Sequence, residues 1–294
     1  MTGLEGISEN LSGPPLLAAL VALGLVVGVL TGLFGVGGAF LLNPILLVAL
    51  RVPEQLIVGS SLCFTIGTGA AGVVRHRGSG NVDGRSTLVL AAGGAVGVLL
   101  GAGLLGLLSG LANFQTVFRA LYVGMLLCVA YLVFREPKPH ASGRSPLQRL
   151  RLRPRVSLTT AGLSDVSLPG LLSVGLLIGA ASGLLGIGGG VLFMPLLLLV
   201  VGMKPHQAVG TSLGVVMLNS IVGTVRYGWE GHVSLPLAMV LLVGSSVGVQ
   251  FGAFICDRIG GRKLRRYFAL VVLAAAVMVA VDLAVGLLAG RDAS

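Results

Sequence analysis

The chain carries one sequence pattern twice, at a constant offset of 151 residues. The stretch GLFGVGGAFLLNP at residues 32–44 returns as GLLGIGGGVLFMP at residues 183–195. The same offset relates VGSSL at residues 58–62 to VGTSL at residues 209–213. A constant offset over this distance means that the two halves are built on one plan. In a strongly apolar chain, such a duplication is typical of membrane transporters made of two repeats.

Composition places this chain in the membrane. Hydrophobic residues make up 55% of it, charged residues only 10%, and the mean hydropathy is +0.99. Soluble domains carry about 25% charged residues. No cleavable signal peptide is expected, because the first basic residue is Arg51 and the N-terminal region carries Glu5 and Glu9. Several apolar stretches reach the roughly 20 residues that a helix needs to cross a bilayer, namely residues 55–74, 87–108, 234–256 and 267–288.

The predicted fold is an all-α polytopic membrane protein with two inverted-topology repeats. Each repeat is a glycine-broken helical hairpin followed by three transmembrane helices. The first repeat covers residues 14–134 and the second covers residues 168–288. Residues 135–167 between them are rich in Arg and Pro, which predicts an exposed, loosely ordered linker. The hairpins are expected at residues 14–50 and 168–202.

The positions of the basic residues predict the topology. Cytoplasmic loops are enriched in Lys and Arg, so the linker and the loops at residues 75–85, around 204 and at 257–266 are expected inside. This arrangement places sixteen of the twenty Lys and Arg in the cytoplasm. Equivalent loops of the two halves then lie on opposite sides, so the repeats are inverted. A multi-pass protein of the cell (inner) membrane is expected, with its linker cytoplasmic. The net charge of +10 reflects this topology, and no nucleic-acid partner is expected because no aromatic-studded basic surface is evident.

The glycine clusters at residues 35–38 and 186–190 are too dense for a regular helix, where each glycine costs about 1 kcal/mol relative to alanine. We expect an unwound turn at each cluster, because glycine tolerates positive φ and close approach of the backbone. Non-helical backbone at membrane depth survives only inside protein or against a water-filled cavity. The short helices that follow would point free N–H groups inward, which suits an anion near the midplane. The alternative is that these glycines only permit tight helix packing.

A few polar residues near these turns complete the candidate site. Ser60, Ser61, Thr211 and Ser212 could offer hydroxyls to an anion, or could simply bond their own backbone one turn back. Thr65, Thr68 and Asn219 lie further along the same two segments. The candidate substrate-binding residues are Gly35, Gly37, Gly38, Asn43, Ser60, Ser61, Gly186, Gly188, Gly189, Gly190, Thr211 and Ser212.

Five further residues are candidates for gating or coupling. Pro44 and Pro195 each remove a helix N–H, so they serve either as flexible points or simply as kinks. Arg75 and Arg226 occupy matched positions at helix ends, where snorkelling anchors are the alternative to a functional role. Asp282 is a carboxylate inside a late apolar segment, and intramembrane acids are candidates for proton coupling.

No catalytic or metal-binding constellation is evident. The residues His76, His206 and His232 are expected in loops, and no His, Cys, Asp and Glu grouping has metal-ligand spacing. No nucleophile–base pair is apparent. The sequence therefore predicts a protein that is not an enzyme and has no cofactor.

The doubled glycine–proline motif, followed by VGSSL and VGTSL, resembles the TauE/SafE family of bacterial and archaeal permeases. The resemblance spans about residues 16–288 and leaves out the linker. It implies transport of sulfur-containing anions such as sulfite, sulfonates or sulfoacetate. One departure is Ala39, where the second copy has Gly190, so the two turns need not contact substrate equally.

These observations together favour a secondary transporter that exports a small anion, with a proton or sodium as a candidate coupling ion. The alternatives are a passive anion channel on the same scaffold and, less favoured, a membrane-embedded enzyme. The sequence leaves the oligomeric state open.

Overall fold

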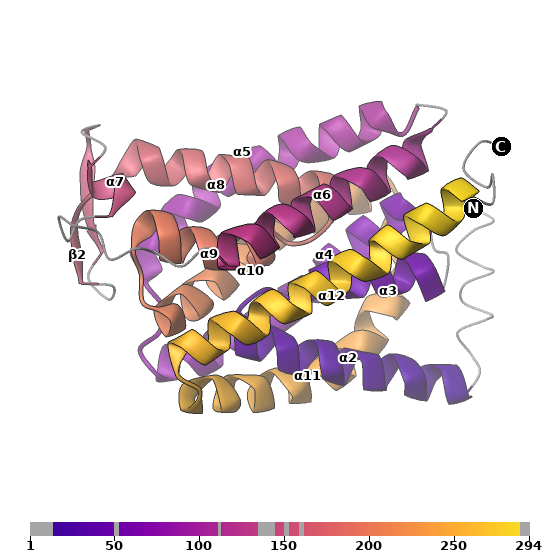
Figure 1. Cartoon of the computed structure of the whole chain (residues 1–294), viewed down its shortest axis with the longest axis horizontal. Helices are drawn as coiled ribbons and strands as arrows, with labels where there is room; N and C mark the ends of the chain where they lie inside the picture. The colour runs from indigo at the N-terminus through magenta and orange to yellow at the C-terminus, as the bar shows by residue number, and fades with distance from the viewer. Residues whose placement is uncertain are drawn as a thin grey trace.

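The computed structural model describes residues 14–49, 53–110, 113–134, 145–149, 153–158 and 162–288, and it is a bundle of long helices (Figure 1). The first half contains α2 (Pro14–Phe34), α3 (Ala39–Ala49), α4 (Glu54–Gly78), α5 (Gly84–Leu108) and α6 (Phe114–Phe134). Between the halves lie α7 (Pro146–Arg149), β1 (Arg155–Leu158) and β2 (Leu163–Ser167). The second half contains α8 (Leu168–Leu185), α9 (Gly190–Leu196), the π-helical η1 (Leu197–Val201), α10 (Pro205–Trp229), α11 (Leu235–Arg258) and α12 (Gly261–Leu288).

Eight helices in the described part of the chain are long and apolar enough to cross a membrane: α2, α4, α5, α6, α8, α10, α11 and α12. The prediction of an all-α polytopic membrane protein is confirmed. Some helices run beyond the apolar segments that predict them, because helical hydrogen bonding continues past the hydrocarbon layer. Arg75 and Arg77 lie in the last turn of α4, and α12 begins at Gly261, ahead of several basic residues.

Contacts between the halves come in matched pairs. Helix α5 packs along α8, and the equivalent helices α11 and α2 pack along each other. Helices α4 and α10 pack together, α10 also contacts α5, and α4 correspondingly contacts α11. Figure 1 shows α2 beginning at the end of the bundle where α12 finishes, whereas α8 begins at the opposite end, beside α7 and β2.

One matched pair of hydrogen bonds ties the central helices to the hairpins. His76 Nε2 lies 3.0 Å from the Gly32 carbonyl oxygen, and the Tyr227 hydroxyl donates to the Gly183 carbonyl at 2.6 Å. Both partners are related by the offset of 151 residues. The predictions that His76 and His206 lie in loops are wrong. His76 is 1% exposed in the last turn of α4, because that helix extends past its apolar segment, and His206 lies in the first turn of α10.

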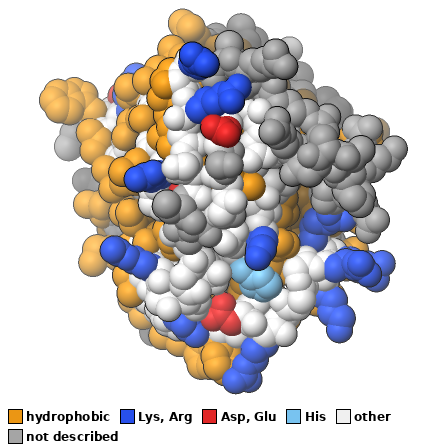
Figure 2. Space-filling model, turned by 90° about the vertical axis from the view of Figure 1, so that its left-hand side faces the viewer, with side chains coloured by type: hydrophobic (Ala, Val, Ile, Leu, Met, Phe, Trp, Pro, Cys, Tyr) orange, Lys and Arg blue, Asp and Glu red, His pale blue; other side chains and the backbone are white. Residues whose placement is uncertain are grey.

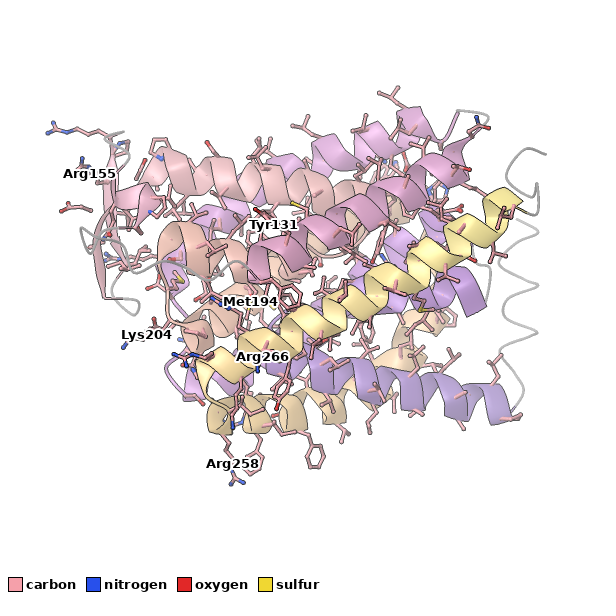
Figure 3. The ribbon with its side chains drawn as sticks, in the orientation of Figure 1. Tyr131, Arg155, Met194, Lys204, Arg258 and Arg266 are labelled. Carbon is pink, nitrogen blue, oxygen red and sulfur yellow. The ribbon has the colours of Figure 1, made fainter. Side chains whose placement is uncertain are left out.

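The segments expected on one side of the membrane lie together. Arg75 at the end of α4 forms an ion pair with Asp257 at the end of α11, with Nη2 and Oδ2 3.5 Å apart. Arg85 Nη1 donates to the Ser157 carbonyl of β1 at 3.2 Å. Figure 2 views this end and shows Lys and Arg side chains gathered around it. Figure 3 labels four of the basic residues at this end: Arg155, Lys204, Arg258 and Arg266.

The described part of the linker is folded and docked. Strands β1 and β2 pair antiparallel, and α7 contacts β2 and η1. Leu147, Leu158 and Val166 are 5%, 1% and 0% exposed and share one apolar cluster with residues of α8, α9 and η1. The expectation of a loosely ordered linker is therefore wrong for these described segments. They are ordered because their apolar side chains are buried against the second hairpin. Residues 135–144, 150–152 and 159–161 lie outside the described part.

Candidate functional site

Both glycine clusters are unwound turns between two helices. Gly35, Gly37 and Gly38 have φ values of 73°, 75° and 86°. The corresponding Gly186, Gly188 and Gly189 have values of 66°, 65° and 77°. Only glycine adopts this left-handed region readily, so the same three positions break each hairpin in the same way. The predicted unwound turns are confirmed.

The two turns meet at one point on the interface of α4 and α10. A Cβ atom added to Gly37 would lie 2.7 Å from both Thr65 Cγ2 and Val216 Cγ1. The same atom added to Gly188 would lie 3.1 Å and 3.2 Å from those two methyl groups. Thr65 and Val216 are themselves related by the repeat offset, so both turns face a common centre.

Direct packing between the hairpins explains why the second copy has one more glycine. A Cβ atom on Gly190 would lie 2.5 Å from Val36 Cα and would overlap the Val36 carbonyl group. Ala39 holds the equivalent position in the first hairpin and is fully buried. Unlike Gly186, Gly188 and Gly189, Gly190 does not have a positive φ. Gly190 therefore serves close packing against the first turn. Tight packing is the alternative role predicted from the sequence for the whole cluster.

Side chains of α4 and α10 hold the first turn in place. Ser212 Oγ donates to the Gly35 carbonyl at 2.6 Å. Thr68 Oγ1 donates to the Gly37 carbonyl at 2.9 Å, and Thr65 Oγ1 lies 3.3 Å from the same oxygen. These bonds satisfy carbonyl groups that the break in the helix would otherwise leave unpaired.

Several buried polar groups near the turns have no hydrogen-bond partner within the described structure. They are Thr31 Oγ1, Ser61 Oγ, Ser182 Oγ, both amide atoms of Asn219, and Ser220 Oγ, and all five residues are 0% exposed. A buried polar group without a partner costs about 1–3 kcal/mol. Such groups are rare in folded proteins and call for an explanation. A ligand that accepts and donates hydrogen bonds at this point would satisfy them.

Thr31, Ser182 and Ser220 are absent from the sequence-based candidate set. One signal points to the first two: Thr31 and Ser182 are related by the repeat offset, and both are polar residues in an apolar helix. Ser220 has Gly69 as its counterpart, so the repeat comparison gives no signal for it.

Ser60 and Thr211 hold loops of the opposite repeat. The Ser60 hydroxyl oxygen accepts the Ser234 backbone N–H at 2.8 Å, and the Thr211 hydroxyl oxygen accepts the Asp83 N–H at 3.0 Å. Asp83 and Ser234 are the N-cap residues of α5 and α11 and are equivalent positions. Each repeat therefore anchors the start of a helix in the other.

Asn43 bridges the two hairpins. Its Nδ2 donates to the Leu185 carbonyl at 3.0 Å, immediately before the second turn, while its Oδ1 has no partner among the described residues. The equivalent position in α9 is Met194, which is fully buried and is labelled in Figure 3. Pro44 lies inside α3, and Pro195 lies inside α9 just before the π-helical stretch.

Two of the charged candidates lie at helix ends rather than at the turns. Arg75 pairs with Asp257, and Arg226 pairs with Glu230 at the end of α10. These partners favour the anchoring alternative for both arginines. The third charged candidate, the Asp282 carboxylate, is 3.5 Å from Arg119 Nη1 across the contact between α6 and α12.

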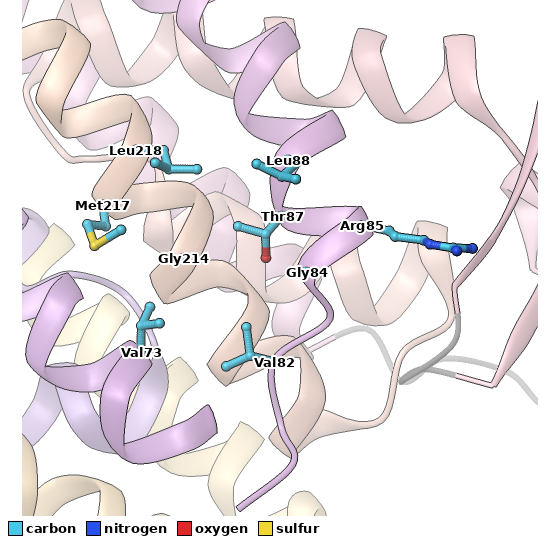
Figure 4. Close-up of a pocket in the computed structure, with 9 residues that line it drawn as sticks. All are labelled: Val73, Val82, Gly84, Arg85, Thr87, Leu88, Gly214, Met217 and Leu218. Carbon is cyan, nitrogen blue, oxygen red and sulfur yellow. The ribbon is translucent and has the colours of Figure 1, made fainter. Parts of the chain in front are cut away.

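A cavity of about 440 Å³ lies between α4, α10 and the start of α5 (Figure 4). Its lining is mostly apolar, and the guanidinium of Arg85 points away from the other lining residues. That guanidinium bonds Ser157 of the linker instead. The cavity therefore lacks the convergent donors that an anion needs, and the glycine turns remain the candidate site.

Comparison with known proteins identifies the family. The family model described as Sulfite exporter TauE/SafE matches residues 20–279, which include both hairpins and all eight apolar spans in whole or in large part. This chain belongs to the TauE/SafE family.

Relatives of this TauE/SafE protein match along nearly the whole chain. A probable membrane transporter protein of Xylella fastidiosa is 30% identical over 269 residues, which cover 90% of this chain and 94% of the relative. The probable membrane transporter protein YjnA of Bacillus subtilis is 30% identical over 262 residues, covering 87% and 96%. YunE of the same organism is 27% identical over 244 residues, covering 80% and 87%. No solved structure matches. The protein is a membrane transporter rather than an enzyme.

Proposed function

We propose that this protein is a secondary transporter that exports a small sulfur-containing anion of the sulfite, sulfonate or sulfoacetate type. The family description supports the anion class and the direction. One structural observation supports the site: two helix breaks meet at the interface of α4 and α10, near fully buried hydroxyl and amide groups that have no hydrogen-bond partner among the described residues. Neutral O–H and N–H donors in a low-dielectric site suit an oxyanion.

Within this proposal the substrate lies between the turns, near the mid-depth of the membrane. The turn glycines let the peptide backbone approach the anion, and Asn43, Ser61 and Ser212 stand beside them. Ser60 and Thr211 act by fixing the helix starts that surround the site. Pro44 and Pro195 are the proposed flexible points of the two short arms.

We infer that the two repeats are inverted and that the linker is cytoplasmic, in the inner membrane. Two observations support the inversion. The contacts between the halves come in matched pairs, and α2 and α8, which are equivalent helices, begin at opposite ends of the bundle. The basic residues at the end carrying α7 and β2 support its cytoplasmic placement. Inverted repeats around one central site are the usual basis of alternating access.

Valine at a turn glycine tests the site. Gly37→Val and Gly188→Val should each abolish sulfite transport in proteoliposomes, because a β-branched residue resists positive φ and the new Cβ meets Thr65 and Val216. The control is Gly124→Val in α6, where an added Cβ meets no described residue within 4 Å. Transport at wild-type rates by both folded turn variants would contradict the proposed site.

Counterflow separates a carrier from a passive channel. If the protein is a carrier, unlabelled sulfite inside proteoliposomes should accelerate the uptake of labelled sulfite. The reason is that a carrier with substrate bound reorients across the membrane faster than an empty carrier. A channel shows no such stimulation. Repeating the assay with an imposed proton or sodium gradient identifies the coupling ion. A thermal-shift screen with sulfite, sulfate, thiosulfate, taurine and sulfoacetate ranks the substrates.

A further inference from the structure

The two glycine turns have the same backbone but different hydrogen bonding. We propose that the second turn, residues 186–190, is where the anion binds, with Ser61 and Ser220 as its donors, and that the first turn, residues 35–38, is a fixed anchor. This inference rests on the proposed function, because it assigns that function's substrate to one of two related positions.

The first turn is held by side-chain donors. Ser212 donates to the Gly35 carbonyl at 2.6 Å, and Thr68 donates to the Gly37 carbonyl at 2.9 Å. Both donors lie on the central helices α10 and α4, which are the most buried of the candidate spans. With its carbonyls occupied, this turn has little freedom to rearrange around a substrate.

The same positions around the second turn carry no such bonds. Ser61 is the counterpart of Ser212, and its hydroxyl has no partner among the described residues. Asn219 is the counterpart of Thr68, and both atoms of its amide are likewise unpaired there. Val216 replaces Thr65 and has no hydroxyl at all.

The backbone places Ser61 beside the second turn. A Cβ on Gly35 would lie 2.7 Å from both Val209 Cα and Ser212 Oγ. A Cβ on Gly186 would lie 2.6 Å from Cα of Val58, the counterpart of Val209. Ser61 follows Val58 as Ser212 follows Val209, so it lies on α4 one turn from the residue that contacts Gly186. Its hydroxyl does not approach that turn as closely as Ser212 Oγ approaches Gly35, because the atoms nearest to a Cβ on Gly186 all belong to Val58.

Ser220 adds a donor that the first turn lacks. Its Oγ lies 3.5 Å from the position that a Cβ on Gly188 would take, and it is fully buried without a partner in the described structure. Its counterpart Gly69 has no side chain. Asn219, the neighbouring residue, lies with its amide against Gly94 of α5, which in turn packs on α8. The hydroxyls of Thr31 and Ser182 both lack a partner in the described part of the chain, so they do not distinguish the turns.

Matched serine-to-alanine variants test this assignment with sulfite as the probe, using purified protein in detergent for thermal unfolding and the same protein in proteoliposomes for the KM of transport. Ser61→Ala and Ser220→Ala should leave the melting temperature unchanged or higher, because each removes a buried hydroxyl for which the described residues offer no partner. Each should raise the KM for sulfite about tenfold or more and reduce the sulfite-induced thermal shift, because a hydrogen bond to a charged ligand is lost.

Ser212→Ala at the matched position should instead lower the melting temperature by about 2–4 °C, because it removes an existing bond to Gly35. Ser246→Ala on α11, whose hydroxyl bonds only the Leu242 carbonyl among its described contacts, is the control and should change neither sulfite binding nor KM.

The outcomes separate this inference from the proposed function. If Ser61→Ala lowers the melting temperature as much as Ser212→Ala, or if neither Ser61→Ala nor Ser220→Ala weakens sulfite binding in a wild-type background that binds it, the asymmetric site is wrong. If wild-type protein shows no response to sulfite, taurine or sulfoacetate, the proposed substrate class fails. The stability comparison then still decides whether the first turn alone is anchored.

Discussion

At the residue scale, the pairing of Arg119 with Asp282 changes how both residues are understood. Asp282 stands out in the sequence as an acid inside an apolar segment, and its counterpart in the first half is Tyr131. The structure places Arg119 Nη1 3.5 Å from it, with side chains 15% and 25% exposed. Arg119 thus holds the Asp282 carboxylate in an ion pair between α6 and α12. Any coupling role of Asp282 would require this pair to separate during transport.

We predict that Arg119→Gln destabilises the protein by about 1–3 kcal/mol, between the values for exposed and for buried ion pairs. The exchanged double variant Arg119→Asp with Asp282→Arg should recover part of that loss. Thermal unfolding in detergent measures both. If the double variant loses as much stability as the losses of the two single variants add up to, the two residues are not coupled.

At the element scale, glycines other than those of the turns join the two halves. Gly93, Gly97 and Gly101 of α5 lie directly against backbone carbonyls of α8, and Gly244, Gly248 and Gly252 of α11 lie against those of α2. The small-residue packing that sequence analysis offered as an alternative for the turns thus applies chiefly to these seams. Close backbone approach lets van der Waals contacts form along the whole helix.

We predict that Gly97→Leu prevents α5 from packing on α8, because a Cβ there overlaps the Leu176 carbonyl and lies 2.7 Å from the Ala180 nitrogen. Little monodisperse protein should be recovered on size-exclusion chromatography. Gly103→Leu in the same helix is the matched control, since a Cβ at Gly103 has no atom of the described structure within 4 Å. Equal recovery of the two variants would show that the seam does not hold the halves together.

At the scale of the whole molecule, the two halves are interleaved rather than set side by side. Each hairpin helix packs on a helix of the other half, and each half supplies the hydroxyl that anchors a helix start in the other. Neither half buries its apolar surface alone. Unfolding should therefore be a single cooperative event.

Cysteine labelling tests the topology of this interleaved fold. In a background without Cys63, Cys128 and Cys256, Gly110→Cys should react with an impermeant reagent in whole cells, whereas Gly260→Cys should react only after permeabilisation. Among the described residues, no atom lies closer than 3.4 Å to a Cβ added at either position. Labelling of Gly260→Cys in intact cells, with Gly110→Cys silent, would reverse the orientation that the basic residues predict.

The sequence by itself determined the membrane class, the duplicated plan and the position and conformation of both helix breaks. These are local properties, because apolar length specifies a spanning helix and clustered glycines specify positive φ. It could not predict the docked linker strands, whose order comes from burying Leu158 and Val166 against the second hairpin.

Only the tertiary structure decided which polar groups are engaged. Ser61 and Ser212 have nearly the same sequence neighbours, yet one hydroxyl is unpaired within the described structure and the other bonds a carbonyl 177 residues away. Arg119 and Asp282 likewise meet only across α6 and α12. A hydrogen bond or ion pair forms only when donor and acceptor are placed to within a few tenths of an ångström. That placement depends on how segments remote in sequence pack together, and no local sequence pattern encodes it.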